Sequence, residues 1–115
     1  MNTISLKIVS SILNVVSALE PKKAFVGRVS RRITKGCVTR VTVCFSLGET
    51  KSSDKTISFD FSSRKQAEKA YKKVHCELLE GSNHGSSFYV ALGICDMKGG
   101  IPLYDTFLDC SFKVV

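Results

Sequence analysis

The sequence predicts a single α+β domain: an antiparallel sheet of about five strands, two hairpins plus one strand, with an N-terminal amphipathic helix and a second helix at 62–80. Two segments carry apolar side chains at helical spacing, and several others alternate apolar and polar residues as strands do. The chain has 115 residues, 43% hydrophobic and 23% charged, which suits one domain, 1–115, with one core.

The first expected element is an amphipathic helix from about residue 3 to residue 19. Its apolar and polar side chains occupy opposite arcs of a helical wheel, and Pro21 follows its end. A signal peptide in residues 1–18 is the alternative, because the Val-Ser-Ala at 16–18 resembles a cleavage site, although a signal core is apolar all round. The segment is too short and too polar to span a bilayer, so no membrane partner is expected.

Two β-rich segments follow at 24–34 and 37–48, and the Lys35-Gly36 step between them predicts a hairpin. A third strand is expected at 56–61, after a polar loop. These elements supply three strands of the sheet.

The first hairpin is expected to carry basic side chains on its outer face. If Phe25 faces the core, Arg28 and Arg32 fall on the same outer face as Arg40. Arg31 then lies among inward positions, so either a bulge shifts the register or the strand ends near residue 30.

The helix at 62–80 has recognisable ends and two distinct sides. Ser63 and Gln66 have the spacing of a capping box, and Gly81 supplies a stop. The buried stripe is expected to comprise Ala67, Ala70, Tyr71, Val74 and Leu78. The opposite side carries Lys65, Lys69, Lys72 and Lys73, although Glu68 and Lys72 have the spacing of an ordinary intrahelical pair.

A second hairpin is expected from the segments 86–97 and 101–115, joined by the turn at 98–100. The last strand places Leu103, Phe107 and Val115 on the face opposite its main apolar row, so the N-terminal helix or another subunit is expected to cover it. Strand pairing between two copies would protect an apolar edge and give a homodimer.

The net charge of +7 is unevenly distributed. Residues 1–40 contain eight Lys or Arg and a single acid, whereas residues 81–115 contain two Lys and three Asp. A one-sided positive field favours an anionic partner, either nucleic acid or an acidic protein surface. Solubility alone is the simpler explanation.

The five cysteines show no metal-binding spacing. They stand at 37, 44, 76, 95 and 110, without a C-x-x-C pair, and the two histidines do not lie at zinc-finger distances from them. We therefore expect no metal or other cofactor. An odd number of cysteines within apolar strands favours free thiols and an intracellular protein, cytoplasmic or nuclear.

The element order over residues 3–80, with Ser63-Arg64-Lys65-Gln66-Ala67 opening the second helix, resembles the double-stranded-RNA-binding domain. The resemblance implies that basic side chains of this helix contact phosphates across a groove. The chain departs from that family at Glu68, Tyr71 and Lys72, lacks a Gly-Pro-x-His loop between its first strands, and continues with two further strands.

These patterns predict a small basic protein that binds nucleic acid mainly through the phosphate backbone. RNA is favoured over DNA as its partner. The predicted contact residues are Arg28, Arg32, Arg40, Lys65, Lys69, Lys72 and Lys73. The alternative is a non-enzymatic interaction module or inhibitor, of the kind found among viral and phage accessory proteins. No enzyme is predicted, because the acids, His75 and His84 form no catalytic pattern in the sequence.

Overall fold

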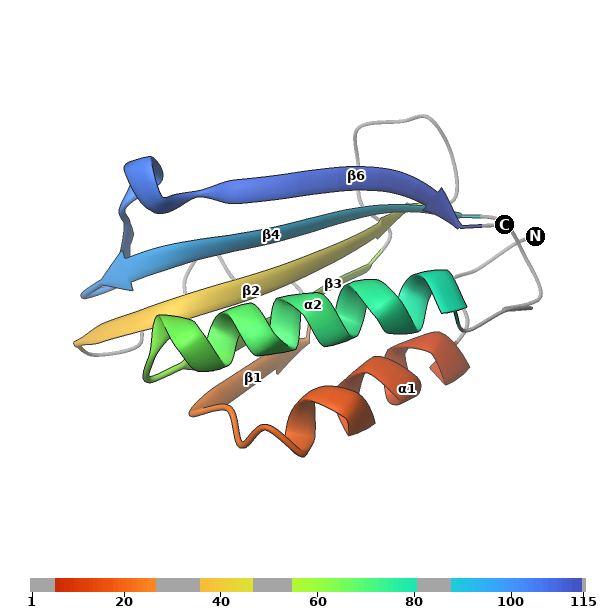
Figure 1. Ribbon diagram of the computed structural model, residues 1–115, viewed down its shortest axis with the longest axis horizontal. Coiled ribbons are helices and arrows are strands. Elements are labelled where there is room, and N and C mark those ends of the chain that lie inside the picture. Colours follow the sequence, from red (N-terminus) through yellow and green to blue (C-terminus); the bar gives the residue numbers. More distant parts are fainter. Residues whose placement is uncertain (1–5, 27–35, 47–54, 81–87, 115) are drawn as a thin grey trace.

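The computed structural model describes residues 6–26, 36–46, 55–80 and 88–114. In chain order the elements are α1 (Leu6–Ser17), β1 (Lys23–Val26), β2 (Cys37–Ser46), β3 (Lys55–Phe61), α2 (Arg64–Glu80), β4 (Phe88–Lys98), β5 (Ile101–Pro102), the 3₁₀ turn η1 (Tyr104–Thr106) and β6 (Leu108–Val114). They form two layers, a six-stranded antiparallel sheet and a pair of helices side by side on one of its faces (Figure 1). The predicted α+β class is confirmed.

The strand order is β1-β3-β2-β4-β5. Strand β6 also pairs with β4, along residues 88–94, whereas β5 pairs with Met97 and Lys98. The predicted first hairpin is wrong in its pairing, because β1 pairs with β3 while β2 lies between β3 and β4. Gly36, expected in the hairpin turn, instead accepts a hydrogen bond from the backbone N–H of Gly99 at 2.9 Å, which joins β2 to the β4–β5 turn. The question of register around Arg31 lies outside the described residues.

The core fills the space between the sheet and the helices. Directly opposed residues in an antiparallel sheet share a face, and the register therefore aligns Val41 with Phe59 on β3 and Ile94 on β4. The buried sheet residues facing the helices are Val41, Val43, Phe45, Ile57, Phe59, Phe61, Val90, Leu92 and Ile94. The helices contribute Val9, Ile12, Val16, Ala67, Ala70, Val74 and Leu78.

Both helices match the amphipathic patterns in their described parts. α1 buries Val9, Ile12 and Val16 and lies along α2, where the Ser11 hydroxyl donates to a Glu77 carboxylate oxygen at 2.6 Å. α2 begins as its capping box predicts, since the N–H of Gln66 donates to Ser63 Oγ at 3.3 Å. Among the described residues, neither helix has the length and apolar character that crossing a membrane requires.

The second hairpin is confirmed, and its turn at Gly99-Gly100 has the two positive φ angles, 57° and 83°, of a tight hairpin turn. Its last strand is not continuous as predicted, because η1 separates β5 from β6. The Thr106 hydroxyl donates to the Leu103 carbonyl at 2.6 Å and accepts the N–H of Asp96 at 2.9 Å. At this point the hydroxyl of Thr106, and not a backbone carbonyl of a paired strand, accepts the N–H of Asp96.

The expected cover over this hairpin is not supplied by α1, which lies on the far side of α2 (Figure 1). Leu103 and Phe107 are both exposed. The apolar residues of β5, η1 and the start of β6 therefore face solvent in the protomer.

Candidate nucleic-acid interface

The exposed side of α2 carries a row of four lysines. Because Ala67, Ala70, Val74 and Leu78 are buried, the residues on the opposite side of the helix project outward. Those residues are Lys65, Lys69, Lys72 and Lys73, all exposed, and we call them the lysine stripe. At about 1.5 Å of rise per residue the stripe extends over about 12 Å.

The acids near the lysine stripe are bound to other residues. The structure assigns Glu68 to Arg64, with Nε to Oε1 at 3.1 Å, instead of the predicted partner Lys72. Glu77 accepts the hydroxyl of Ser11. Within the described part of the chain, the ion pairs involve Arg40 and Arg64 and no lysine of the stripe. Its amines are thus presented to solvent.

An open groove between the two helices borders the C-terminal half of the stripe. It has a volume of about 350 Å³ and is lined by Val15, Lys72, Lys73, Cys76 and Glu77. The two amines in this lining favour an anionic group, whereas the Glu77 carboxylate opposes one. The groove therefore favours a phosphate beside Lys72 and Lys73 only where it stays clear of Glu77.

Arg40 lies on the opposite face of the sheet, away from the lysine stripe. Its guanidinium is bound by Asp60, whose side chain has no solvent exposure, while that of Arg40 is 11% exposed. Phe25 was expected to face the core, but its register opposite Ser58 places it on the face of Arg40, and the Arg40 guanidinium carbon lies 5.3 Å from the centre of its ring. Arg40 thus has a structural role in this face of the sheet.

The remaining arginines predicted to contact phosphate, Arg28 and Arg32, lie outside the described residues. Of the seven residues predicted for phosphate contact, the structure brings together Lys65, Lys69, Lys72 and Lys73. Arg40 does not share their surface. Among the described residues, the basic side chains of the sheet and those of α2 therefore do not form one common surface.

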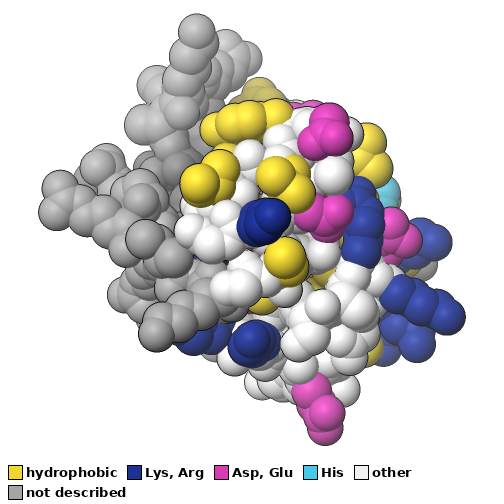
Figure 2. Space-filling view, turned by 90° about the vertical axis from the view of Figure 1, so that its left-hand side faces the viewer, with side chains coloured by type: hydrophobic (Ala, Val, Ile, Leu, Met, Phe, Trp, Pro, Cys, Tyr) yellow, Lys and Arg dark blue, Asp and Glu magenta, His cyan; other side chains and the backbone are white. Residues whose placement is uncertain are grey.

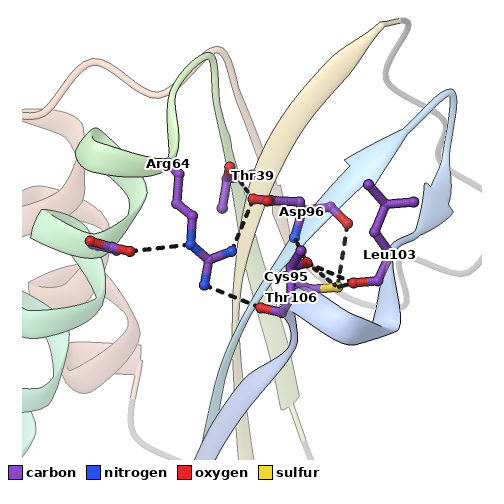
Figure 3. Close-up of polar contacts among 7 residues, drawn as sticks. Thr39, Arg64, Cys95, Asp96, Leu103 and Thr106 are labelled. Atoms are coloured by element: carbon purple, nitrogen blue, oxygen red, sulfur yellow. Dashed lines mark hydrogen bonds and ion pairs between the residues drawn. The ribbon is translucent and has the colours of Figure 1, made fainter.

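Arg64, at the start of α2, connects three parts of the molecule (Figure 3). NH1 donates to Asp96 at 3.0 Å, NH2 donates to the Thr106 carbonyl at 3.1 Å, and Nε donates to Glu68. Partial burial lowers the pKa of Arg64, but the hydrogen bonds and charges of Asp96 and Glu68 outweigh this and raise it above its usual value. Arg64 therefore stays charged and fixes η1 beside the helix.

The same cluster includes a buried thiol and a hydroxyl. Thr39 Oγ1 donates to Asp96 at 2.7 Å, and Cys95 Sγ donates to the Leu103 carbonyl at 3.5 Å (Figure 3). No pattern in the sequence predicts these contacts, because Arg64 and Asp96 are 32 positions apart and each resembles an ordinary surface charge. The cluster satisfies polar groups around the η1 turn and has the character of a structural network.

The titratable side chains between α2 and β6 are engaged in packing. The Tyr71 hydroxyl donates to Cys110 Sγ at 3.2 Å, and the ring of His75 lies edge-on to Phe112 with centroids 5.0 Å apart. Burial, with the Cys110 hydrogen bond and the charges of Cys110 and Asp109, raises the pKa of Tyr71 to about 12. Within the described residues, no three His, Cys, Asp or Glu side chains gather where they could hold a metal ion.

Figure 2 shows the end of the molecule where β4 turns into β5. Basic side chains gather at the right of this view, over the helix layer, and hydrophobic ones near the top, above β5 and η1. The exposed hydrophobic residues of this region are Ile101, Leu103, Tyr104, Phe107 and Leu108. The gathering of basic side chains over the helix layer and the hydrophobic residues near the top therefore occupy different parts of this view, with single charged side chains lying among the hydrophobic ones.

Comparisons with protein-family models, curated proteins and solved structures found no significant match to this chain. They give no support to the resemblance to the double-stranded-RNA-binding domain.

Proposed function

We propose that the protein binds nucleic acid, with RNA favoured, through contacts between the lysine stripe and the phosphate backbone. The observation that carries this proposal is the placement of four exposed lysines on one side of α2, none of them in an ion pair within the described residues. Amines presented in this way release counterions from a phosphate backbone when they bind it. The net charge of +7 adds a long-range attraction.

The composition of α2 favours recognition of backbone and shape over bases. The ring of Tyr71 is partly buried, and its hydroxyl is bound to Cys110, so it is not presented for stacking on a base. Double-stranded RNA is bound mainly through its phosphates and 2′-hydroxyls. A lysine row without an exposed aromatic neighbour on its helix suits such a partner. The five unpaired cysteines suit the reducing compartments in which RNA is found.

The proposal is tested by replacing Lys65, Lys69 and Lys72 together with Gln, which keeps helix propensity and leaves the buried side of α2 intact. The matched control replaces the exposed lysines Lys22, Lys23 and Lys98, which lie outside α2, and removes the same charge. Binding to single- and double-stranded RNA and DNA is measured across a salt series. On a duplex, the stripe variant should flatten the slope of log K against log salt by about 0.9 per lost contact.

The control should weaken binding less and leave the slope nearly unchanged. Equal losses in both variants would show that net charge alone attracts nucleic acid. Absence of salt-dependent binding by the wild-type protein at low ionic strength would contradict the proposal. The alternative, a non-enzymatic interaction module, is favoured by the exposed apolar residues of β5, η1 and β6.

A further inference from the structure

One edge of the sheet is formed by β6. All seven of its residues pair with β4, from Leu108 opposite Ile94 to Val114 opposite Phe88. Within the described part of the chain, β6 has no strand on its other side, and it lies at the margin of the sheet in Figure 1. At the opposite edge, the described part of β1 has four residues. A seven-residue edge presents backbone N–H and C=O groups that can pair with another strand.

The side chains of β6 on the helix-free face form a pattern that complements itself. Asp109, Ser111 and Lys113 share this face, because they are opposed to Gly93, Ala91 and Tyr89, and all three are exposed. The acid and the base lie equally far from Ser111, on either side of it. Two such strands paired antiparallel about Ser111 bring Asp109 of each copy opposite Lys113 of the other.

We propose that two copies of this chain form a homodimer by antiparallel pairing of their β6 strands, with Ser111 at the two-fold axis. Charge selects this register from its neighbours. Centring on Cys110 or Phe112 would leave Asp109 and Lys113 without an opposite charge in the other copy. Centring on Asp109 would oppose two carboxylates, and centring on Lys113 would oppose two amines, both of which are unfavourable. Centring on Ser111 forms two opposite-charge pairs by symmetry.

Other contacts at the edge support the same arrangement. The Lys113 ammonium lies 5.6 Å from the centre of the Tyr89 ring, which supports its position on the helix-free face. On the helix face, Leu108 is 61% exposed in the protomer and lies, in the proposed register, opposite residue 114 of the second copy. Pairing would remove this apolar side chain from water.

The proposed symmetry also determines where the helices lie. A two-fold axis perpendicular to the sheet leaves both helix layers on the same face of one continuous sheet. The two lysine stripes then lie on one side of the dimer. The dimer would thus double the cationic surface available to an extended anion, although its formation does not depend on nucleic acid.

Charge reversal in the absence of nucleic acid tests the register. Sedimentation across a concentration series should show a wild-type dimer, and Asp109→Lys or Lys113→Asp should each weaken it at least about tenfold through two like-charge pairs. Mixing the two single variants should restore a dimer, because one copy then carries a base at both positions and the other an acid at both. The double variant D109K/K113D should dimerise alone. Lys98→Asp, at the exposed β4–β5 turn, serves as the control and should have no effect.

A cross-link provides a second measurement. Opposed residues in antiparallel strands have Cα atoms about 4.5–5.5 Å apart, within the range that a disulfide spans. In a background with Cys37→Ser and Cys76→Ser, which removes the exposed thiols, Ser111→Cys should form a disulfide-linked dimer under mild oxidation. Ser10→Cys, exposed on α1, should not.

Circular dichroism establishes that each variant is folded. A wild-type protein that stays monomeric at all concentrations would overturn the proposal and identify Lys113 as a residue that protects the edge. A dimer unaffected by both charge reversals, or failure of the two single variants to recombine, would assign dimerisation to another surface.

Discussion

Arg40 and Asp60 lie directly opposite each other on β2 and β3 and form a two-point ion pair on the helix-free face of the sheet. Arg40 Nε lies 2.7 Å from Oδ1 of Asp60, and NH2 lies 3.0 Å from Oδ2. The Asp60 side chain is fully buried, so its charge depends on the protein for compensation. A base that the sequence places on a binding surface thus stabilises the sheet.

Arg40→Met should lower the free energy of unfolding by about 3–5 kcal/mol, because it removes a cation bound to a fully buried carboxylate. Urea denaturation measures the loss. Adding Asp60→Asn should recover part of it, since the buried negative charge is then removed as well. Lys98→Met, at an exposed position, should change stability by no more than about 0.5 kcal/mol. A loss below about 1 kcal/mol in Arg40→Met would show that Asp60 is compensated by other groups.

Tyr71 should make the protein sensitive to alkaline pH. Its pKa is raised from 10.0 to about 12 in the folded state, so the folded protein favours the neutral phenol. The associated stabilisation is fully present below about pH 10 and is lost as the pH rises to about 12. The difference in unfolding free energy between the wild type and Tyr71→Phe should therefore shrink over this range.

Ultraviolet titration of the folded protein provides the direct measurement. One of the three tyrosines should ionise late in the wild type, and this late transition should be missing in Tyr71→Phe. If no tyrosine ionises near pH 12 in the wild type, the Tyr71 hydroxyl is not held between α2 and β6 as the structure shows.

Gly93 should be coupled to Phe107, whose ring lies against it on the helix-free face. A Cβ at Gly93 would meet Phe107 Cε2 at 3.2 Å, tighter than ordinary contact. Gly93→Ala should therefore cost about 1 kcal/mol in the wild type. In a Phe107→Ala background the same change should become neutral or stabilising, because alanine restricts the unfolded chain.

Thermal or urea unfolding of the four proteins gives the coupling energy, expected to be at least about 0.5 kcal/mol. Leu108→Ala, at an exposed neighbour of Phe107, is the control background and should leave the cost of Gly93→Ala unchanged. Equal costs in all backgrounds would show that the ring does not pack on Gly93.

Features that depend on residue spacing within a single helix, strand or turn are predictable from the sequence. The buried and exposed sides of α2, the Ser63 cap and the Gly99-Gly100 turn follow from spacing within one element, and the structure has them. Alternation along a strand shows which residues share a face, but not which strand lies beside it. Hence the predicted pairing of β1 with β2 is wrong, and so is the predicted position of Phe25 on the core face.

Periodicity within one element does not predict the polar contacts between elements that are distant in the sequence. Arg40 and Asp60 are 20 positions apart, and Arg64 and Thr106 are 42 apart, so neither pair has a spacing signal. Each basic residue carries the same pattern whether it binds a partner outside the protein or an acid within it. The lysine stripe was predictable because a helix places its members on one side without help from distant residues.

The central position of β4 has a consequence for synthesis on the ribosome. Each of the ten residues of β2 is paired with a residue of β4, which is translated after both helices and after β1, β2 and β3. A nascent chain ending at residue 80 has both helices and three strands but an open β2 edge beneath α2. The sheet can therefore close only after residues 88–98 have emerged, and a truncation after α2 should expose an aggregation-prone edge.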